Sequence, residues 1–281
     1  MTVREALERA HHALAAAGIE TPRLDATVLL AHAAGWNKAR LLASYPENLE
    51  KGTMLLFENF IEKRLSGLPV SYIRGFKEFY GLEFRVDKRV LVPRPDTETL
   101  VDAAAQIIRQ TPDALRVLDV CTGSGCVAIT LQHLFPHITV HASDISSFSL
   151  EVFKKNSSEI LGYEMKAVES DLFDKIDGKF DLITANPPYL SDDEYALMEK
   201  EKWPEPKNAL AAGEDGLEII RELIPRSLEY LFMNGYVLLE AAYWQMNEIR
   251  QIMEEAGFSD VSIHRDLAGR QRVIIGKKRK V

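Results

Sequence analysis

The spacing of apolar side chains changes along the chain. Up to Pro69 they recur at helical intervals, as Val3, Leu7 and Leu14 do, whereas from Arg116 onward short apolar runs alternate with longer helical patterns. Strands that alternate with helices usually form a parallel sheet with right-handed connections. The pattern therefore predicts a small helical domain followed by a larger α/β domain.

Four helices are expected in the first part. Thr2 and Glu5 fit a capping box at the start of the first helix, which Gly18 can close. A second helix begins at Pro22, a residue suited to the first helical position, and stops near Gly35. Two more helices are predicted over residues 38–43 and 54–65.

The segment after Val70 predicts a β-hairpin. Apolar and polar residues alternate from Glu78 to Val86 about a turn at Gly81. This hairpin would join the two domains. We therefore expect a helical domain over residues 1–72, a hairpin linker over 73–92 and an α/β domain over 93–281.

The α/β domain is expected to contain a Rossmann-like seven-stranded sheet whose last strand is antiparallel. Its strands are predicted at residues 116–120, 139–144, 167–172, 182–185, 235–240, 261–265 and 271–275. Helices are predicted at residues 97–109, from Cys126, from Asp215 to Leu231, and at residues 243–256. Pro225 should kink the third of these helices.

Composition limits the class of protein. The chain of 281 residues is 46% hydrophobic and 27% charged, as in ordinary globular proteins. It has no apolar run of the ~20 residues that a membrane helix requires. The start lacks the apolar core of a signal peptide, and two cysteines cannot form a disulfide framework. We therefore expect a cytoplasmic protein without membrane binding.

Charge and metal-ligand spacing exclude further classes. The formal net charge of −8 is unlike that of proteins that bind duplex nucleic acid, so no direct nucleic-acid binding is expected. Neither Cys121 nor Cys126 shares metal-ligand spacing with any of the seven histidines. We expect no metal site. A monomer is the default expectation.

A glycine turn follows the first strand of the sheet. Residues 121–125 read Cys-Thr-Gly-Ser-Gly, and such a turn lets a ligand approach the backbone before a helix starts. The dinucleotide fingerprint is incomplete because Ala128 stands three positions past Gly125, and the Gly-Lys-Ser/Thr element of a P-loop is missing. The turn favours a ligand with a ribose and an amino acid but no phosphate.

Two carboxylates at successive strand ends support such a ligand. Asp144 ends the second strand, nineteen positions beyond Gly125, where open α/β sheets bind ribose hydroxyls. Asp171 and Leu172 end the third strand and could meet the edge and the face of an adenine. Their joint occurrence favours ligand binding over helix capping.

The fourth strand ends at an amide. Residues 182–185 are apolar, and ladder pairing must stop at Asn186 because Pro187 and Pro188 cannot donate a hydrogen bond. The Asn186 side chain is thereby placed at the sheet edge where α/β proteins bind ligands. The run Asn186-Pro-Pro-Tyr189 resembles the motif with which several methyltransferases hold a planar NH2 group, an amide or a base amine, beside S-adenosylmethionine (SAM).

Nearly the whole chain resembles the bacterial release factor glutamine methyltransferases. That family methylates N5 of the glutamine in the Gly-Gly-Gln motif of class I peptide chain release factors. Beside Asn186-Pro-Pro-Tyr189, the resemblance is carried by Arg23-Leu-Asp25, Leu29-Leu-Ala-His32, Pro69-Val-Ser-Tyr-Ile-Arg-Gly75, Glu78-Phe-Tyr-Gly81, Val92-Pro-Arg-Pro-Asp-Thr-Glu98, Leu118-Asp-Val-Cys-Thr-Gly-Ser-Gly125, Ala212-Gly-Glu-Asp-Gly-Leu217 and Asp266-Leu-Ala-Gly-Arg270. It implies a class I SAM-dependent methyltransferase fold, SAM as cofactor, a release factor as protein partner, and substrate docking by the helical domain.

Carried over by position, the resemblance implies roles for particular residues. The residues that the resemblance implies contact SAM are Cys121, Thr122, Gly123, Ser124, Gly125, Asp144, Leu172 and Asn186. Asp171 is added to them because of its place at a strand end. The residues expected to contact the substrate glutamine are Asn186, Pro187, Pro188 and Tyr189. The chain departs from the family pattern in that Cys121 replaces a common glycine, Leu172 replaces a tryptophan of some members, and Ala241-Ala242 replaces Ile-Gly. We expect Cys121 to be a small buried residue rather than a reactive one.

Our mechanistic hypothesis assigns catalysis to Asn186, Pro187 and Tyr189. The Asn186 side-chain oxygen and the Pro187 carbonyl would accept hydrogen bonds from the two N–H groups of the substrate amide. Tyr189 would pack on the amide plane. A glutamine methyltransferase that acts on a ribosomal protein, an adenine N6 methyltransferase and a binding module without activity are the alternatives.

Overall fold

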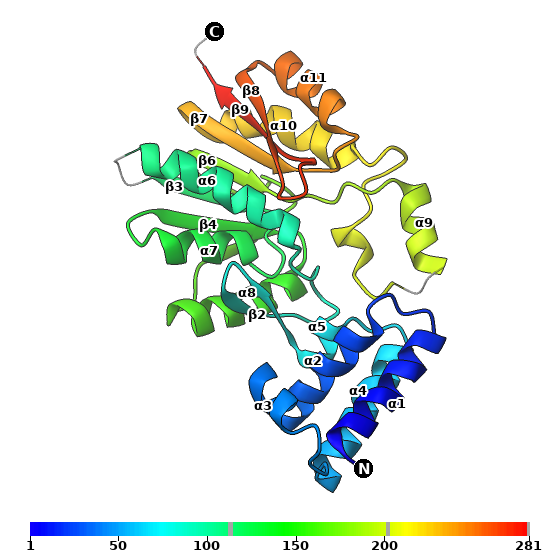
Figure 1. Ribbon diagram of the computed structural model, residues 1–281. Helices are drawn as coiled ribbons and strands as arrows, with labels where there is room; N and C mark the ends of the chain where they lie inside the picture. Colours follow the sequence, from blue (N-terminus) through cyan, green and yellow to red (C-terminus); the bar gives the residue numbers. More distant parts are fainter. Residues whose placement is uncertain (112–114, 201–202, 280–281) are drawn as a thin grey trace. The chain divides into compact units, whose positions relative to one another are not determined.

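The computed structural model describes residues 1–111, 115–200 and 203–279. The chain forms two compact units, one of Met1–Phe76 and one that holds most of the chain from Lys77 onward. Each unit has its own hydrophobic core. Figure 1 shows both units and labels most of their helices and strands.

Within residues 1–76, all of which are described, five helices form the first unit. The four predicted helices are confirmed as α1 (Val3–Ala16), α2 (Pro22–Ala34), α3 (Lys38–Ala43) and α4 (Lys51–Leu65). A short helix that the periodicity did not predict, α5 (Val70–Arg74), lies between Pro69 and Gly75. Thr2 and Glu5 form the predicted capping box of α1.

The core of the first unit is built from the apolar stripes of its helices. Leu14, Leu29 and Phe57 are almost fully buried at its centre. An ion pair of 2.7 Å between Arg64 and Asp25 ties α4 to α2. Both groups have little access to water, so this pair resists screening better than a surface pair does.

The predicted hairpin is present as β1 (Phe76–Phe79) and β2 (Leu82–Arg85). Phe79 and Phe84 are buried and contact each other edge to face, with ring centroids 5.9 Å apart. Both side chains belong to the core of the second unit. The hairpin is therefore anchored to that unit by aromatic packing.

The second unit is organised around a mixed sheet. Its described residues form seven strands in the order β5-β4-β3-β6-β7-β9-β8. The strands are β3 (Arg116–Val120), β4 (Thr139–Asp144), β5 (Ala167–Glu169), β6 (Phe180–Ala185), β7 (Leu231–Glu240), β8 (Phe258–Arg265) and β9 (Gln271–Lys278). The strands from β5 to β7 pair in parallel, and β9 pairs antiparallel with both β7 and β8. The predicted seven-stranded sheet with an antiparallel last strand is confirmed.

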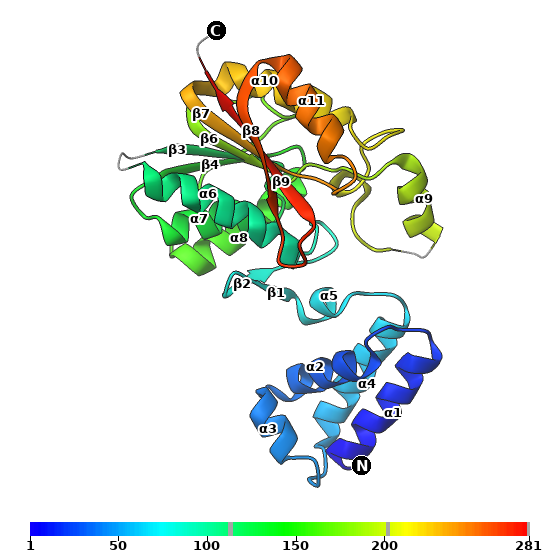
Figure 2. The same ribbon diagram turned by 45° about the horizontal axis from the view of Figure 1, so that its top comes forward.

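Helices cover both faces of this sheet (Figures 1 and 2). One face packs against α6 (Glu98–Gln110), α7 (Cys126–Leu134) and α8 (Ser147–Leu161), and the other against α10 (Glu218–Tyr230) and α11 (Met246–Ala256). Successive strand residues point to opposite faces. Accordingly, Val117 belongs to the first core cluster and Leu118 to the second.

Several predicted boundaries were wrong. The helix predicted from Asp215 to Leu231 begins at Glu218, and Leu231 opens β7 instead. The third strand ends at Glu169, so that Asp171 and Leu172 lie in the loop after it. Pro225 lies within α10 on its exposed side. The helices α8 and α9 (Asp192–Lys200) were not predicted.

The physical reason is clear for α8. Its buried face includes the polar residues Asn156 and Ser157 beside Val152 and Phe153, so apolar spacing alone does not reveal a helix there. No helix in the described ranges is long and apolar enough to cross a membrane.

Candidate active site

A cavity of about 370 Å³ opens at the carboxyl ends of the parallel strands. Its position follows from the strand register, because Val120 pairs with both Ser143 and Ala185. The next residue on each of the three strands therefore emerges at the same edge. The expected site residues among the lining are Cys121, Thr122, Gly123, Ser124, Asp144, Asp171, Leu172, Asn186 and Pro188. The expected residues outside the lining are Gly125, Pro187 and Tyr189.

The glycine turn wraps one end of the cavity. Cys121 has a φ of 58°, a left-handed conformation that glycine adopts more easily than other residues. This conformation gives a reason why glycine suits that position. Burial and the carboxylates of Asp144 and Asp119 raise the pKa of the Cys121 thiol well above its ordinary value, which keeps the thiol protonated.

Gly125 has a packing role. Its φ is +85°, and a Cβ at this position would lie 2.5 Å from Phe153 and 2.6 Å from Ile129. The absence of a side chain lets α7 start directly against α8. The prediction that Gly125 contacts a ligand has no support in the cavity lining.

Asp144 is held in place by backbone amides. The Gly123 N–H donates to one carboxylate oxygen at 2.8 Å, and the Ser146 N–H donates to the other at 2.9 Å. Burial raises the pKa of Asp144, and these two hydrogen bonds oppose the shift. A fixed carboxylate with lone pairs on the cavity side suits the recognition of two neighbouring hydroxyls.

Asp119 is a cavity residue that the sequence analysis missed. Its carboxylate accepts hydrogen bonds from the hydroxyls of Thr122, at 2.6 Å, and Thr184, at 2.7 Å. Burial raises its pKa to about 6. Asp119 thus ties the glycine turn to β6. An acidic residue inside an apolar strand was the signal that could have indicated it.

The run Asn186-Pro-Pro-Tyr189 follows the end of β6, and its residues Asn186 and Pro188 line the cavity. The Asn186 amide donates to the Thr97 hydroxyl at 3.3 Å. Burial raises the pKa of Tyr189 to about 12, so its phenol stays neutral. Its backbone carbonyl accepts a hydrogen bond of 2.9 Å from the Gln245 side chain. A Cβ on Gly216 would lie 2.3 Å from the same carbonyl, so only glycine fits there.

The run from Pro93 to Glu98 forms a second wall, since Pro93, Arg94 and Thr97 line the cavity. Arg94 forms an ion pair with Glu205, whose side chain is fully buried. The other polar side chains of the run have partners too: Asp96 pairs with Arg272 at 2.8 Å, and Glu98 accepts a hydrogen bond from the Tyr80 N–H at 2.8 Å. The wall is thus fixed by these contacts with three distant segments.

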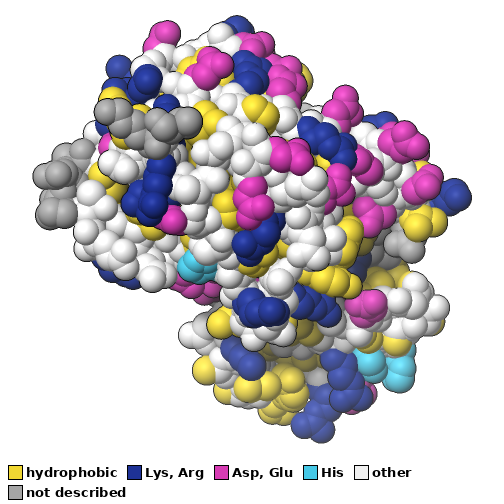
Figure 3. Space-filling model, turned by 90° about the horizontal axis from the view of Figure 1, so that it is seen from above, with side chains coloured by type: hydrophobic (Ala, Val, Ile, Leu, Met, Phe, Trp, Pro, Cys, Tyr) yellow, Lys and Arg dark blue, Asp and Glu magenta, His cyan; other side chains and the backbone are white. Residues whose placement is uncertain are grey.

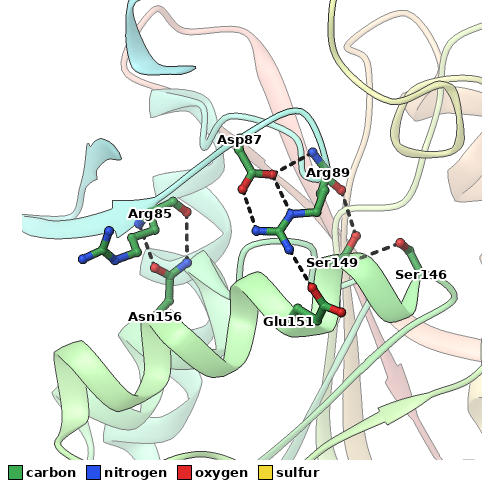
Figure 4. A network of polar contacts seen from close by, with 7 residues as sticks. All are labelled: Arg85, Asp87, Arg89, Ser146, Ser149, Glu151 and Asn156. Carbon is green, nitrogen blue, oxygen red and sulfur yellow. Dashed lines mark hydrogen bonds and ion pairs between the residues drawn. The ribbon is translucent and has the colours of Figure 1, made fainter. Parts of the chain in front are cut away.

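A polar network holds the linker after the hairpin against α8 (Figure 4). The Asn156 side chain bonds the backbone N–H and carbonyl of Arg85, at 2.7 and 3.1 Å, and the Ser124 carbonyl at 2.8 Å. Arg89 pairs with Asp87 and Glu151, and its carbonyl accepts from the Ser149 hydroxyl. The network positions Val90 and Leu91, which line the cavity.

Within the described residues, no group of three or more histidine, cysteine or acidic side chains is arranged to hold a metal ion. The polar groups that line the cavity include amide, hydroxyl and carboxylate groups and the Arg94 guanidinium, and apolar side chains lie between them. Such a lining suits an organic ligand with hydroxyls and an amino group.

Comparison with known proteins identifies the family. The model of the PrmC N-terminal domain matches residues 5–75, and that of the methyltransferase small domain matches residues 97–202. A release factor glutamine methyltransferase from Rhodopirellula baltica is 37% identical, with 93% of this chain and 91% of the relative covered. One from Koribacter versatilis is 36% identical, with 99% of both chains covered. The chain belongs to the release factor glutamine methyltransferase family.

Solved structures agree with the fold expected of a release factor glutamine methyltransferase. A methyltransferase from Pyrococcus furiosus is 18% identical with a TM-score of 0.53, covering 73% of this chain and 92% of that one. A T. thermophilus 16S rRNA methyltransferase in complex with AdoMet and guanosine is 17% identical with a TM-score of 0.55, covering 73% of this chain and 50% of that one. At such identities the likeness concerns the fold alone, and it confirms the predicted methyltransferase fold.

Proposed function

We propose that this chain transfers the methyl group of SAM to N5 of the glutamine in the Gly-Gly-Gln motif of class I peptide chain release factors. The observation that carries the proposal is the Asn186 side chain, which lines the cavity at the end of β6 and is fixed by Thr97. The family's named activity supports the choice of a release factor as the partner.

The cavity residues fit SAM. Asp144, oriented by Gly123 and Ser146, would bind the ribose hydroxyls. Asp171 and Leu172 would meet the adenine, and Cys121 to Gly123 would border the amino acid part. A Cβ at Gly123 would meet no atom within 4 Å, so the backbone there is open to a ligand. When bound, SAM would supply an electrophilic methyl group: the S–CH3 bond breaks as the N–CH3 bond forms, S-adenosyl-L-homocysteine is left, and the amide nitrogen then releases one proton.

The residues after β6 would orient the acceptor. An amide nitrogen is a weak nucleophile because its lone pair is delocalised into the carbonyl. The Asn186 Oδ1 and the Pro187 carbonyl would accept hydrogen bonds from the two N–H groups of the substrate amide. These bonds would align the lone pair of the amide nitrogen with the methyl group. Tyr189, neutral because its pKa is about 12, would cover the amide plane and exclude water rather than act as a base.

The surface charge supports a protein substrate over nucleic acid. The formal net charge is −8, and on the face seen in Figure 3 Lys and Arg side chains are interspersed with Asp and Glu. Binding to a phosphate backbone favours a continuous basic stripe. We propose further that the first unit docks the release factor and that the enzyme works in the cytoplasm as a monomer.

Incubation with labelled SAM tests the substrate. The enzyme is offered a release factor, a ribosomal protein and DNA in separate reactions. We expect label on the release factor alone, and its loss when the glutamine of the Gly-Gly-Gln motif is changed to alanine. Label on the ribosomal protein or on DNA would establish one of the alternatives instead.

Calorimetry tests the cofactor site. The Asp144→Ala variant should bind SAM about 10-fold or more weakly, because it loses charge-assisted hydrogen bonds. The matched variant Asp193→Ala, on the exposed side of α9, should bind SAM as the wild type does. Equal affinity in Asp144→Ala would mean that the ribose is bound elsewhere.

A further inference from the structure

The hydroxyl of Thr97 forms hydrogen bonds with residues of the cavity wall rather than with the backbone of its own helix. Thr97 stands at the N-cap of α6, yet its side chain makes no capping hydrogen bond. A threonine at this position usually accepts from a backbone N–H of the first turn. Here the hydroxyl accepts from the Asn186 amide at 3.3 Å and hydrogen-bonds to the buried carboxylate of Glu240 at the end of β7.

The chemistry of the three groups fixes the direction of both bonds. While Glu240 is ionised, its carboxylate can only accept, so the Thr97 hydroxyl must donate its single proton to it. The hydroxyl oxygen can then only accept from Asn186, which turns the Nδ2 of Asn186 toward Thr97. Because the carboxamide is planar, its Oδ1 is left available on the other side as an acceptor.

Glu240 lies in a buried environment that restricts the hydrogen bonds its carboxylate can make. Its side chain is buried, and its Oε2 has no hydrogen-bond partner among the described residues. Burial raises the pKa of this carboxylate most, while the hydrogen bond from Thr97 and the positive charge of Arg272 lower it. The charged or titratable groups that face it are Arg272 from β9, Asp96 and Arg94 from the run before α6, Tyr189, and Cys126 at the start of α7.

We propose that Glu240, acting through Thr97, sets the orientation of the Asn186 carboxamide, so that Oδ1 rather than Nδ2 meets the N–H bonds of the substrate amide. Glu240 and Thr97 are then positioning residues. The inference rests on the proposed glutamine methylation. If the carboxamide were reversed, the Nδ2 amino group of Asn186 would face the NH2 group of the substrate amide. Both groups are hydrogen-bond donors, so no hydrogen bond would form and the substrate nitrogen would not be aligned.

Substitution of Thr97 tests the relay in the full-length enzyme. The isosteric change Thr97→Val removes the hydroxyl and should lower kcat about 10-fold or more, since one orienting hydrogen bond is lost. Thr97→Ser keeps the hydroxyl and should restore most of kcat. The matched variant Thr111→Val removes a threonine hydroxyl at the other end of α6, where it bonds the Ile107 carbonyl, and should leave kcat unchanged. SAM affinity should stay the same in all three.

The pH profile gives a readout that a merely structural role would not move. Burial raises the pKa of Glu240 to about 7, so the carboxylate is ionised only as the pH rises through that value. In the wild type, kcat should rise with pH around 7. The Glu240→Gln variant carries no titratable group there, and its kcat should be lower and free of this step.

The outcomes separate this inference from the proposed function. If the wild type does not methylate the release factor, the proposed function is overturned, and the relay, which rests on it, is overturned with it. If the wild type is active and Thr97→Val turns over as fast as Thr111→Val, or the pH step persists in Glu240→Gln, the relay is overturned. A loss of kcat in Thr97→Val that Thr97→Ser restores supports it.

Discussion

At the scale of single residues, the cavity wall depends on buried polar groups that constrain one another. Asp119 holds Thr122 and Thr184, while Glu240 and Thr97 hold Asn186. An unpaired buried polar group costs about 1–3 kcal/mol. Each side chain in these networks is therefore confined to the few orientations in which its donors meet acceptors.

Loss of the Asn186 amide should affect turnover more than cofactor binding. We expect Asn186→Ala to lower kcat by roughly 10²–10³, the effect of removing one preorganised hydrogen-bonding group from an active site. SAM affinity should change less. Steady-state kinetics with the release factor measures the effect, and Asn247→Ala on the exposed side of α11 is the control. Near-normal turnover in Asn186→Ala would remove the catalytic hypothesis.

The buried carboxyl of Glu240 should also make stability depend on pH. Its pKa in the folded protein is raised from 4.5 to about 7, so folding favours the protonated form. The resulting stabilisation is fully present below pH 4.5 and is lost as the pH rises through about 7. The shift corresponds to roughly 3 kcal/mol.

Urea unfolding of the wild type and Glu240→Gln at several pH values between about 5 and 8 tests this. The free energy of unfolding of the wild type should fall more steeply with rising pH than that of the variant. Parallel curves would show that Glu240 does not titrate in this range.

At the scale of elements, the turn between β3 and α7 combines ligand access with close packing. Gly123 faces the cavity with free space around it, whereas Gly125 is pressed between Phe153 and Ile129. The two glycines belong to one motif, but Gly123 leaves space for a ligand whereas Gly125 allows close packing. Sequence alone treats them alike.

Alanine substitution should separate the two. Gly125→Ala should lower the free energy of unfolding by roughly 2–4 kcal/mol, because it combines a left-handed φ with overpacking. Gly123→Ala should cost about 1 kcal/mol, since only the left-handed φ opposes it. Urea unfolding of both variants measures the difference. Equal costs would contradict the packing role of Gly125.

At the scale of the whole molecule, the chain has two separate hydrophobic cores. The first unit buries Leu14, Leu29 and Phe57 among its own helices, and the second buries its apolar side chains on the two faces of the sheet. Units with their own cores can fold independently.

Deletion of the first unit should therefore separate docking from cofactor binding. We expect a chain that begins at Gly75 to bind SAM with unchanged affinity and to show a raised KM for the release factor. Calorimetry measures the first quantity and steady-state kinetics the second. Loss of SAM binding would make the first unit a folding partner of the second instead.

The sequence by itself determined the elements and the edge at which the site forms. Hydrophobic periodicity, capping residues, glycines and prolines are local signals, and they located the four longer helices of residues 1–76, the hairpin and the strands of the sheet. Because parallel strands present their carboxyl ends at one edge, strand order along the chain is enough to group Cys121, Asp144 and Asn186. Motif resemblance identified the family.

Only the tertiary structure decided which side chains fix that site. Thr97 meets Asn186 across 89 positions of the chain, and Asn156 meets Arg85 across 71. The insertion of β9 between β7 and β8 brings Arg272 to Asp96 and beside Glu240. The distant hydrogen-bond partner of a polar residue cannot be predicted from the residues around it in the sequence. The buried networks therefore become visible only once packing has excluded water and forced each donor to find an acceptor.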